Sequence, residues 1–234
     1  MRTVSHRRLI APPSDDFVAV LVLLTGAYVL YTATESGWAR FVVAGLYVLA
    51  LVLAVRAASP TRRQTATFGW VVAACVIAIA LAYVLLPDDD AAGVTDAVIA
   101  LVLMVTLVLV ISRVLAHRRV TVQTIAGALS AYLLIGMLFA AVYGVMTWRS
   151  DTPFFASGDV ADARSLQYFS FTTLTTLGYG DLTAADFPGR GVATFEALTG
   201  QIFLTTLVAR LVATFRRQSD GPDGTVGGST DDES

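Results

Sequence analysis

The stretch that decides the fold lies at residues 164–181. Residues 164–175 read Arg-Ser-Leu-Gln-Tyr-Phe-Ser-Phe-Thr-Thr-Leu-Thr, and residues 176–181 read Thr-Leu-Gly-Tyr-Gly-Asp. The first part would make about three helical turns, too few to cross a bilayer, and it is too apolar for an ordinary loop. We therefore expect a re-entrant helix here, with Asp162 as its N-cap.

The second part of the stretch alternates glycine with L-residues. Gly178 and Gly180 readily adopt positive φ, and this alternation turns successive carbonyl groups to the same side of the chain. Extended backbone at membrane depth is tolerated where it lines a watery path or is buried in protein. A row of carbonyl oxygens can replace the hydration shell of a cation. One chain supplies one row, so several copies are needed around an axis.

Long apolar runs flank this stretch and predict an all-α integral membrane protein. The chain is 56% hydrophobic and 15% charged, whereas soluble domains average about 45–50% apolar and about 25% charged. With about 20 apolar residues needed per crossing, we expect six transmembrane helices, with the re-entrant helix between the last two. They are residues 17–34, 38–56, 67–86, 95–115, 120–148 and 191–215.

The arginines predict the orientation of these spans. With a cytoplasmic N-terminus, only Arg40, Arg149, Arg164 and Arg190 of the sixteen basic residues fall outside. This positive-inside bias places both termini in the cytoplasm. We expect the protein to lie in the plasma membrane. Pro12, Pro13, Asp15 and Asp16 precede the first span, which favours an uncleaved anchor over a signal peptide.

The chain divides into three expected parts. Residues 1–119 form a four-helix membrane module of unknown role, residues 120–217 form the part that carries residues 164–181, and residues 218–234 form a disordered acidic tail. A net charge of -2 argues against nucleic acid as a partner. No ligand-binding domain is visible, because the tail is short. Cys75 lies alone in an apolar run, where packing is the expected role.

Residues 176–181 resemble the selectivity filter of the potassium channel family, whose filter is Thr-Val-Gly-Tyr-Gly. Leu177 stands in place of the valine, and Asp181 follows as it usually does in that family. Residues 120–215 also have the order of the simplest bacterial two-helix channels. That order is outer helix, pore helix, filter, a short loop with Gly189 and Arg190, and inner helix.

The resemblance implies a homotetrameric channel that binds K⁺ and uses no organic cofactor. The carbonyl groups of Thr176, Leu177, Gly178 and Tyr179 would hold K⁺, and Gly180 would complete the outer mouth. Asp181 would lie behind the filter. The pore helices would direct their negative C-terminal ends at a central cavity.

Three positions behind the filter depart from the family pattern. Thr172 stands where many members have a buried carboxylate, and Tyr168 and Phe169 stand where tryptophans often brace the filter. Tyr168 can still donate a hydrogen bond to Asp181, but Phe169 has no donor. We therefore expect selectivity to survive and resistance to filter collapse to be reduced.

Glu196 is the ionisable residue well inside a span. Burial of such a group is costly and usually marks function. We expect it to hydrogen-bond to the pore helix at Thr172 or Thr173, and so to support the filter. A purely structural tie between helices is the alternative.

Gly200 follows Gly180 by twenty residues, which is where the family places an inner-helix hinge. Close packing against the pore helix is the alternative. The helical period puts Gln201, Leu204, Val208 and Val212 on one stripe, which we expect to face the pore axis and form the gate. The small residues of the fifth span should pack against the inner helix; they are Ala126, Gly127, Ser130, Ala131, Gly136, Ala140 and Gly144.

Several rival functions are weighed against this interpretation. A voltage sensor needs several arginines in the fourth span, which has only Arg113, so the first four spans are expected to be a scaffold. A non-selective cation channel and a non-conducting membrane scaffold or sensor subunit remain alternatives. An enzyme is not expected, since the spans lack a Ser–His, paired-carboxylate or metal-ligand set.

Overall fold

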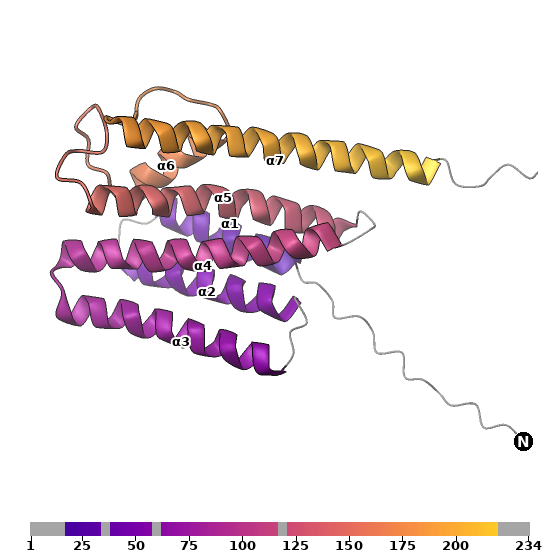
Figure 1. Cartoon of the computed structure of the whole chain (residues 1–234), viewed down its shortest axis with the longest axis horizontal. Helices are drawn as coiled ribbons and strands as arrows, with labels where there is room; N and C mark the ends of the chain where they lie inside the picture. Colours follow the sequence, from indigo (N-terminus) through magenta and orange to yellow (C-terminus); the bar gives the residue numbers. More distant parts are fainter. Residues whose placement is uncertain (1–16, 34–37, 58–61, 117–120, 220–234) are drawn as a thin grey trace, which may run out of the picture.

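The computed structural model describes residues 17–33, 38–57, 62–116 and 121–219. Within these ranges the chain forms seven helices (Figure 1). They are α1 (Phe17–Ala33), α2 (Trp38–Ala57), α3 (Arg62–Leu85), α4 (Asp88–Ala116), α5 (Val122–Trp148), α6 (Ala163–Leu174) and α7 (Phe187–Ser219). The predictions for the first sixteen residues and for residues 220–234, including the disordered tail, lie outside the described residues, as do Arg118 and Arg119.

Three of the described helices are long and apolar enough to cross a membrane. They are α4, α5 and the part of α7 from Phe187 to Arg210. The apolar segments Phe17–Ala33, Val42–Arg56 and Val72–Leu85 are shorter. Each of the six predicted spans therefore coincides with a helix. By length and composition, three of these helices could cross a membrane.

Three helix starts lie several residues before the sequence-based boundaries, and α3 begins at Arg62 instead of residue 67. α7 begins at Phe187, so Gly189 and Arg190 lie in its first turn and not in a loop. α4 begins at Asp88, so the acidic cluster Asp88–Asp90 forms its first turn. Carboxylates there are favoured by the partial positive charge of the helix N-terminus, which explains why the helix extends beyond its apolar residues.

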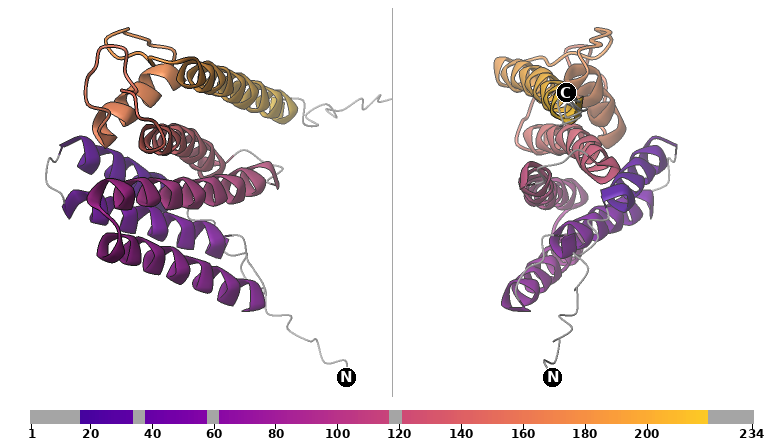
Figure 2. Two further views of the ribbon diagram at one scale, coloured as in Figure 1. Left: turned by 60° about the vertical axis from the view of Figure 1, so that its left-hand side comes forward. Right: turned by 90° about the vertical axis from the view of Figure 1, so that its right-hand side faces the viewer.

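The helices are layered around α5. Figure 1 shows α3 at one side of the molecule and α7 at the opposite side, with α4 and α5 between them. The short helix α6 packs against both α5 and α7, whereas α1 and α4 pack on other faces of α5. The turned views in Figure 2 show the same order. α5 therefore connects the first four helices to the α6–α7 pair.

The sequence predicted that the small residues of α5 pack against α7, but its three glycines Gly127, Gly136 and Gly144 lie against other helices. A Cβ at Gly127 would lie 2.6 Å from Val114 of α4, and one at Gly136 would lie 2.8 Å from the Phe171 ring of α6. At Gly144 a Cβ would overlap the Asp96 carboxylate of α4. For these three glycines the expected packing partner was wrong, because helical small-residue spacing shows where a neighbour comes close and not which neighbour it is.

Candidate functional site

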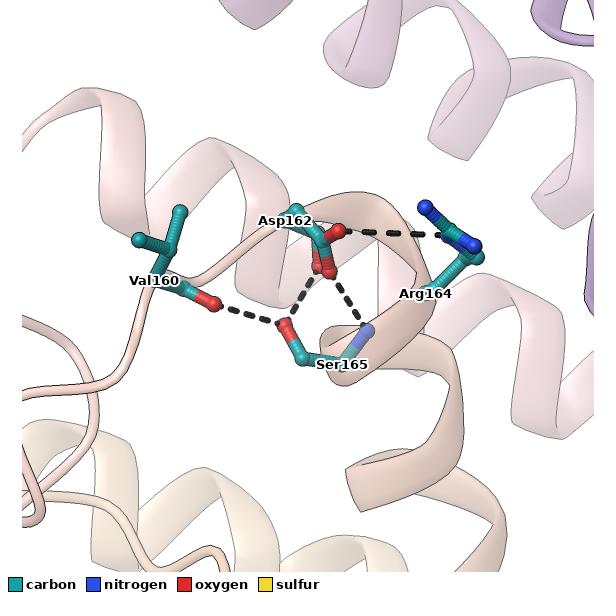
Figure 3. Close-up of polar contacts among 4 residues, drawn as sticks. All are labelled: Val160, Asp162, Arg164 and Ser165. Carbon is teal, nitrogen blue, oxygen red and sulfur yellow. Dashed lines mark hydrogen bonds and ion pairs between the residues drawn. The ribbon is translucent and has the colours of Figure 1, made fainter. Parts of the chain in front are cut away.

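The site begins at the N-terminus of α6. Asp162 is the N-cap, as predicted, and its Oδ1 accepts a 2.8 Å hydrogen bond from the Ser165 backbone N–H. The Ser165 hydroxyl donates to the carbonyl oxygens of Val160 and Asp162, and the Arg164 guanidinium lies 4.0 Å from Asp162 Oδ2 (Figure 3). The bond to the Ser165 N–H satisfies one of the backbone donors that a helix start leaves unpaired, and together these contacts fix where α6 begins.

The buried face of α6 packs into an aromatic cluster. Phe169 is 6% exposed, and its ring centroid lies 5.1 Å from that of Tyr143, 5.9 Å from Phe154 and 5.7 Å from Phe155. Edge-to-face and tilted aromatic pairs at these separations are favourable. Phe169 cannot donate a hydrogen bond, as a tryptophan at this position could. It therefore contributes packing instead.

The sign of the φ angle alternates along the backbone after α6. Thr176, Gly178 and Gly180 have φ values of 59°, 52° and 81°, and the intervening Leu177 and Tyr179 are not in the positive-φ region. A β-branched residue such as Thr176 is a genuine outlier at positive φ. Such strain persists only where surrounding contacts impose it, and it concentrates at functional sites. The alternation turns consecutive carbonyl groups toward one side.

Contacts from two helices hold this strained segment. The Gly178 N–H donates to the Thr172 carbonyl at 3.1 Å, inside α6. From α7, the Gln201 amide nitrogen donates to the Thr176 hydroxyl at 3.3 Å. Gln201 had been expected to face an open axis, and its contact places it at the inner end of the segment.

Tyr168 and Asp181 brace the other end of the segment. The Tyr168 hydroxyl donates a 2.8 Å hydrogen bond to Asp181 Oδ2, as the sequence predicts. The Tyr168 ring also stacks on Tyr179, with centroids 6.5 Å apart and planes 3° from parallel. The bond from Tyr168 lowers the pKa of Asp181 below its ordinary value, and the same bond raises the pKa of Tyr168. The contact is therefore charge-assisted at neutral pH.

Glu196 of α7 is fully buried among three helices. Its Oε2 accepts a 2.6 Å hydrogen bond from the Tyr143 hydroxyl of α5, and its Oε1 accepts one from the Ser170 hydroxyl of α6. The expected partners, Thr172 and Thr173, were wrong. The Thr172 hydroxyl bonds within its own helix, to the Phe169 carbonyl at 3.0 Å.

Sequence reasoning missed Ser170 and Tyr143 as functional residues. Ser170 lies four residues after Leu166 and four before Leu174, and all three are buried. The helical period therefore places its hydroxyl on the buried face of α6. Tyr143 is a fully buried residue with a hydroxyl in an apolar helix, and such a group needs a partner. Those two signals could have indicated the pair.

Gly200 permits the closest approach between α6 and α7. A Cβ at Gly200 would overlap the Leu174 carbonyl oxygen and would lie 2.9 Å from Leu174 Cδ1. The same carbonyl accepts a hydrogen bond from the Tyr132 hydroxyl at 3.3 Å. The glycine therefore has a packing role, and α7 is one continuous helix from Phe187 to Ser219. The hinge stays a prediction.

The predicted gate residues lie on an exposed part of α7. In the single chain Leu204 is 37% exposed, Val208 57% and Val212 53%. The structure thus leaves this stripe without a covering helix among the described residues. It does not bring the stripe near the buried Glu196 group.

Two connecting segments on either side of α6 are joined to one another. Phe155 and Ala184 form an isolated antiparallel bridge, with a 2.8 Å hydrogen bond from Ala156 N–H to the Thr183 carbonyl. Arg190 adds a bond from its Nε to the Ala184 carbonyl at 3.0 Å. No pattern in the sequence signalled this bridge, because one pair of residues has no periodicity.

Residues 127–217 match a family model described as "Ion channel". The match begins inside α5 and extends over α6, the strained segment and most of α7. It supports an ion channel in a membrane and gives no indication of an enzyme. No curated protein and no solved structure matches the chain.

Proposed function

We propose that the chain is one subunit of a potassium-selective channel, in which four identical subunits surround a central pore. The observation that carries the proposal is the alternating backbone of Thr176, Gly178 and Gly180, with positive φ at every second residue. Four such rows around an axis provide the rings of carbonyl oxygens that replace the hydration shell of K⁺.

The groups around this segment support the same chemistry. The carbonyls of Thr176, Leu177, Gly178 and Tyr179 would coordinate K⁺, with the Thr176 hydroxyl below them. The C-terminus of α6 carries the partial negative charge of the helix dipole and would stabilise a cation in the cavity. Tyr168 and Asp181 would keep the outer half from collapsing, as their hydrogen bond suggests.

The surface of α7 supports assembly into a tetramer. Phe195, Leu198 and Ile202 are 65%, 56% and 65% exposed in the single chain. Apolar side chains alone could face lipid, but Gln201 and Thr205 are exposed on the same helix. Polar groups at membrane depth normally face a helix interface or a water-filled cavity. A four-fold arrangement would give the apolar residues neighbours and give Gln201 access to water.

The first four helices would cross the plasma membrane together with α5 and α7. Their arginines favour cytoplasmic N- and C-termini, and lipid would cover the exposed side chains of α3, such as Val84 at 78%. In this arrangement K⁺ moves passively, and no organic cofactor or nucleic acid takes part.

The cytoplasmic half of α7 would form the gate. Leu204, Val208 and Val212 would line the pore below Gln201, and rings of valine can close a pore by dewetting. Cysteine accessibility tests this. Reagents applied from the cytoplasm should modify Val208→Cys much faster in open channels than in closed ones, and state-independent modification would place the gate elsewhere.

A flux assay tests the proposed function. Purified full-length protein is reconstituted in liposomes, and uptake is compared in potassium and in sodium, with and without barium. We expect barium-sensitive potassium uptake and little sodium uptake. Equal uptake of both ions would favour a non-selective cation channel. An absence of uptake from correctly assembled protein would favour a scaffold or sensor subunit.

A further inference from the structure

A small cavity lies where α1, α2 and α4 of the four-helix module meet α5 and α6. Its volume is about 40 Å³. Its polar wall residues come from four helices: Tyr31 of α1, Tyr47 of α2, Asp96 of α4 and Gln167 of α6. Ala140 and Ala141 of α5 are among its apolar wall residues. The cavity is thus a meeting point of the four-helix module and the helix that precedes the filter.

Gln167 lines this cavity and has an unsatisfied donor. The residue is 2% exposed, and its Nε2 is buried without a hydrogen-bond partner in the described part of the chain. A buried amide that has lost its water and gained no partner is strongly unfavourable. Buried polar groups in native proteins are nearly always satisfied, by protein or by ordered water. Gln167 therefore calls for an occupant in the cavity.

The size and chemistry of the cavity select that occupant. A water needs roughly 10–15 Å³ and two to four polar partners, and the cavity meets both requirements. Within the described ranges, no group of three or more His, Cys, Asp or Glu side chains could hold a metal ion. An apolar cavity would stay dry, but this one has a carboxylate and two tyrosines in its wall.

We propose that the cavity binds ordered water that accepts a hydrogen bond from Gln167 Nε2 and donates to the Asp96 carboxylate. The water joins α6 to α4 across the cavity. The four-helix module thereby takes part in positioning α6 through α4. This inference concerns binding of water, and it stands whether or not the chain conducts potassium.

A double-mutant cycle on the full-length protein tests the water. Ala141→Val adds two methyl groups to the cavity wall, and Gln167→Met removes the donor at nearly constant length. If water is bound, Ala141→Val displaces it and lowers the melting temperature in the wild-type background. The same substitution should then lower the melting temperature less, or raise it, in the Gln167→Met background, where the cavity has no donor to satisfy.

A matched control comes from the same helix. Ala131 is 1% exposed and does not line the cavity, so Ala131→Val should shift the melting temperature equally in both backgrounds. Equal shifts from Ala141→Val as well would show a dry cavity and overturn the proposal. If Gln167→Met does not fold, Gln167→Leu replaces it in the cycle.

An experimental structure at a resolution that shows ordered water gives the direct observation. We expect solvent density within hydrogen-bond distance of Gln167 Nε2 in the wild type, and none in Gln167→Met. An empty cavity, or a Gln167 amide turned onto a protein acceptor, would contradict the inference.

Discussion

The Tyr143 hydroxyl donates a 2.6 Å hydrogen bond to Oε2 of Glu196, at a point where α5, α6 and α7 meet. The Ser170 hydroxyl lies between the other carboxylate oxygen and the Gly136 carbonyl, 2.7 Å from the latter. The buried Glu196 side chain of α7 thus connects that helix to both α5 and α6. The position of α6 depends on this group.

Replacing Glu196 should reveal its hydrogen bonds. Glu196→Leu leaves the Tyr143 hydroxyl without an acceptor and should lower the free energy of unfolding by about 2 kcal/mol, the typical cost of an unsatisfied buried group. Glu196→Gln keeps one acceptor oxygen and should cost less. Thermal unfolding of the purified assembly measures both. Equal destabilisation by the two variants would mean that packing, and not hydrogen bonding, is the role of Glu196.

The glycines of the proposed filter should not tolerate a side chain. Gly178 has open space around its Cβ position, so Gly178→Ala is opposed by its φ of 52° and not by a clash. A residue other than glycine costs roughly 1–2 kcal/mol there, and relaxing the strain would turn a carbonyl away. We expect loss of selective potassium flux. Gly158 has a φ of 79° and open space in the outer loop, so Gly158→Ala should keep selective flux.

Gly200 distinguishes close packing from a hinge. An alanine there would push against the Leu174 carbonyl, so Gly200→Ala should lower the melting temperature and disturb the filter. Gly191, in the same helix, has nothing within 4 Å of its Cβ position. Gly191→Ala should be neutral, or stabilising by up to about 1 kcal/mol. If Gly200→Ala keeps full thermal stability and lowers only the open probability, the hinge is the better account.

The Tyr168–Asp181 contact predicts a response to acid. The pKa of Asp181 is lowered in the folded protein, so the contact stabilises the fold above the ordinary aspartate pKa. That contribution is lost as the pH falls through the lowered value. Tyr168→Phe removes the main cause and should raise the pH at which acid accelerates the decay of potassium current. The decay rate is measured while the external pH is lowered from 6 toward 3 in both proteins. An unchanged acid midpoint in the variant would contradict this.

The helices and the alternating backbone could be predicted from local sequence. Asp162 marks its helix start by its own side-chain chemistry, and Gly178 and Gly180 mark the alternation by lacking a Cβ. Both signals act within a few residues, so they need no knowledge of the rest of the fold. The Tyr168–Asp181 pair followed instead from the family resemblance, which implies an aromatic brace at Tyr168 and a carboxylate at Asp181.

Partners that come together across the fold could not be predicted. Tyr143 and Glu196 are 53 residues apart, and the rotation of α5 relative to α7 decides which hydroxyl reaches the carboxylate. A neighbouring threonine was an equally good candidate on sequence grounds. The packing of Gly136 on Phe171 and the cavity at Gln167 depend likewise on helix rotation, which composition and periodicity leave open.

The most direct test of the central claim is a reversal potential. Purified protein in a planar bilayer is placed between equal concentrations of potassium and sodium. The alternating carbonyls of residues 176–180 predict a reversal potential far from zero, in the direction that a membrane permeable to potassium alone would give. A reversal potential near zero in the wild-type protein would mean that the two ions pass equally, and it would contradict the account.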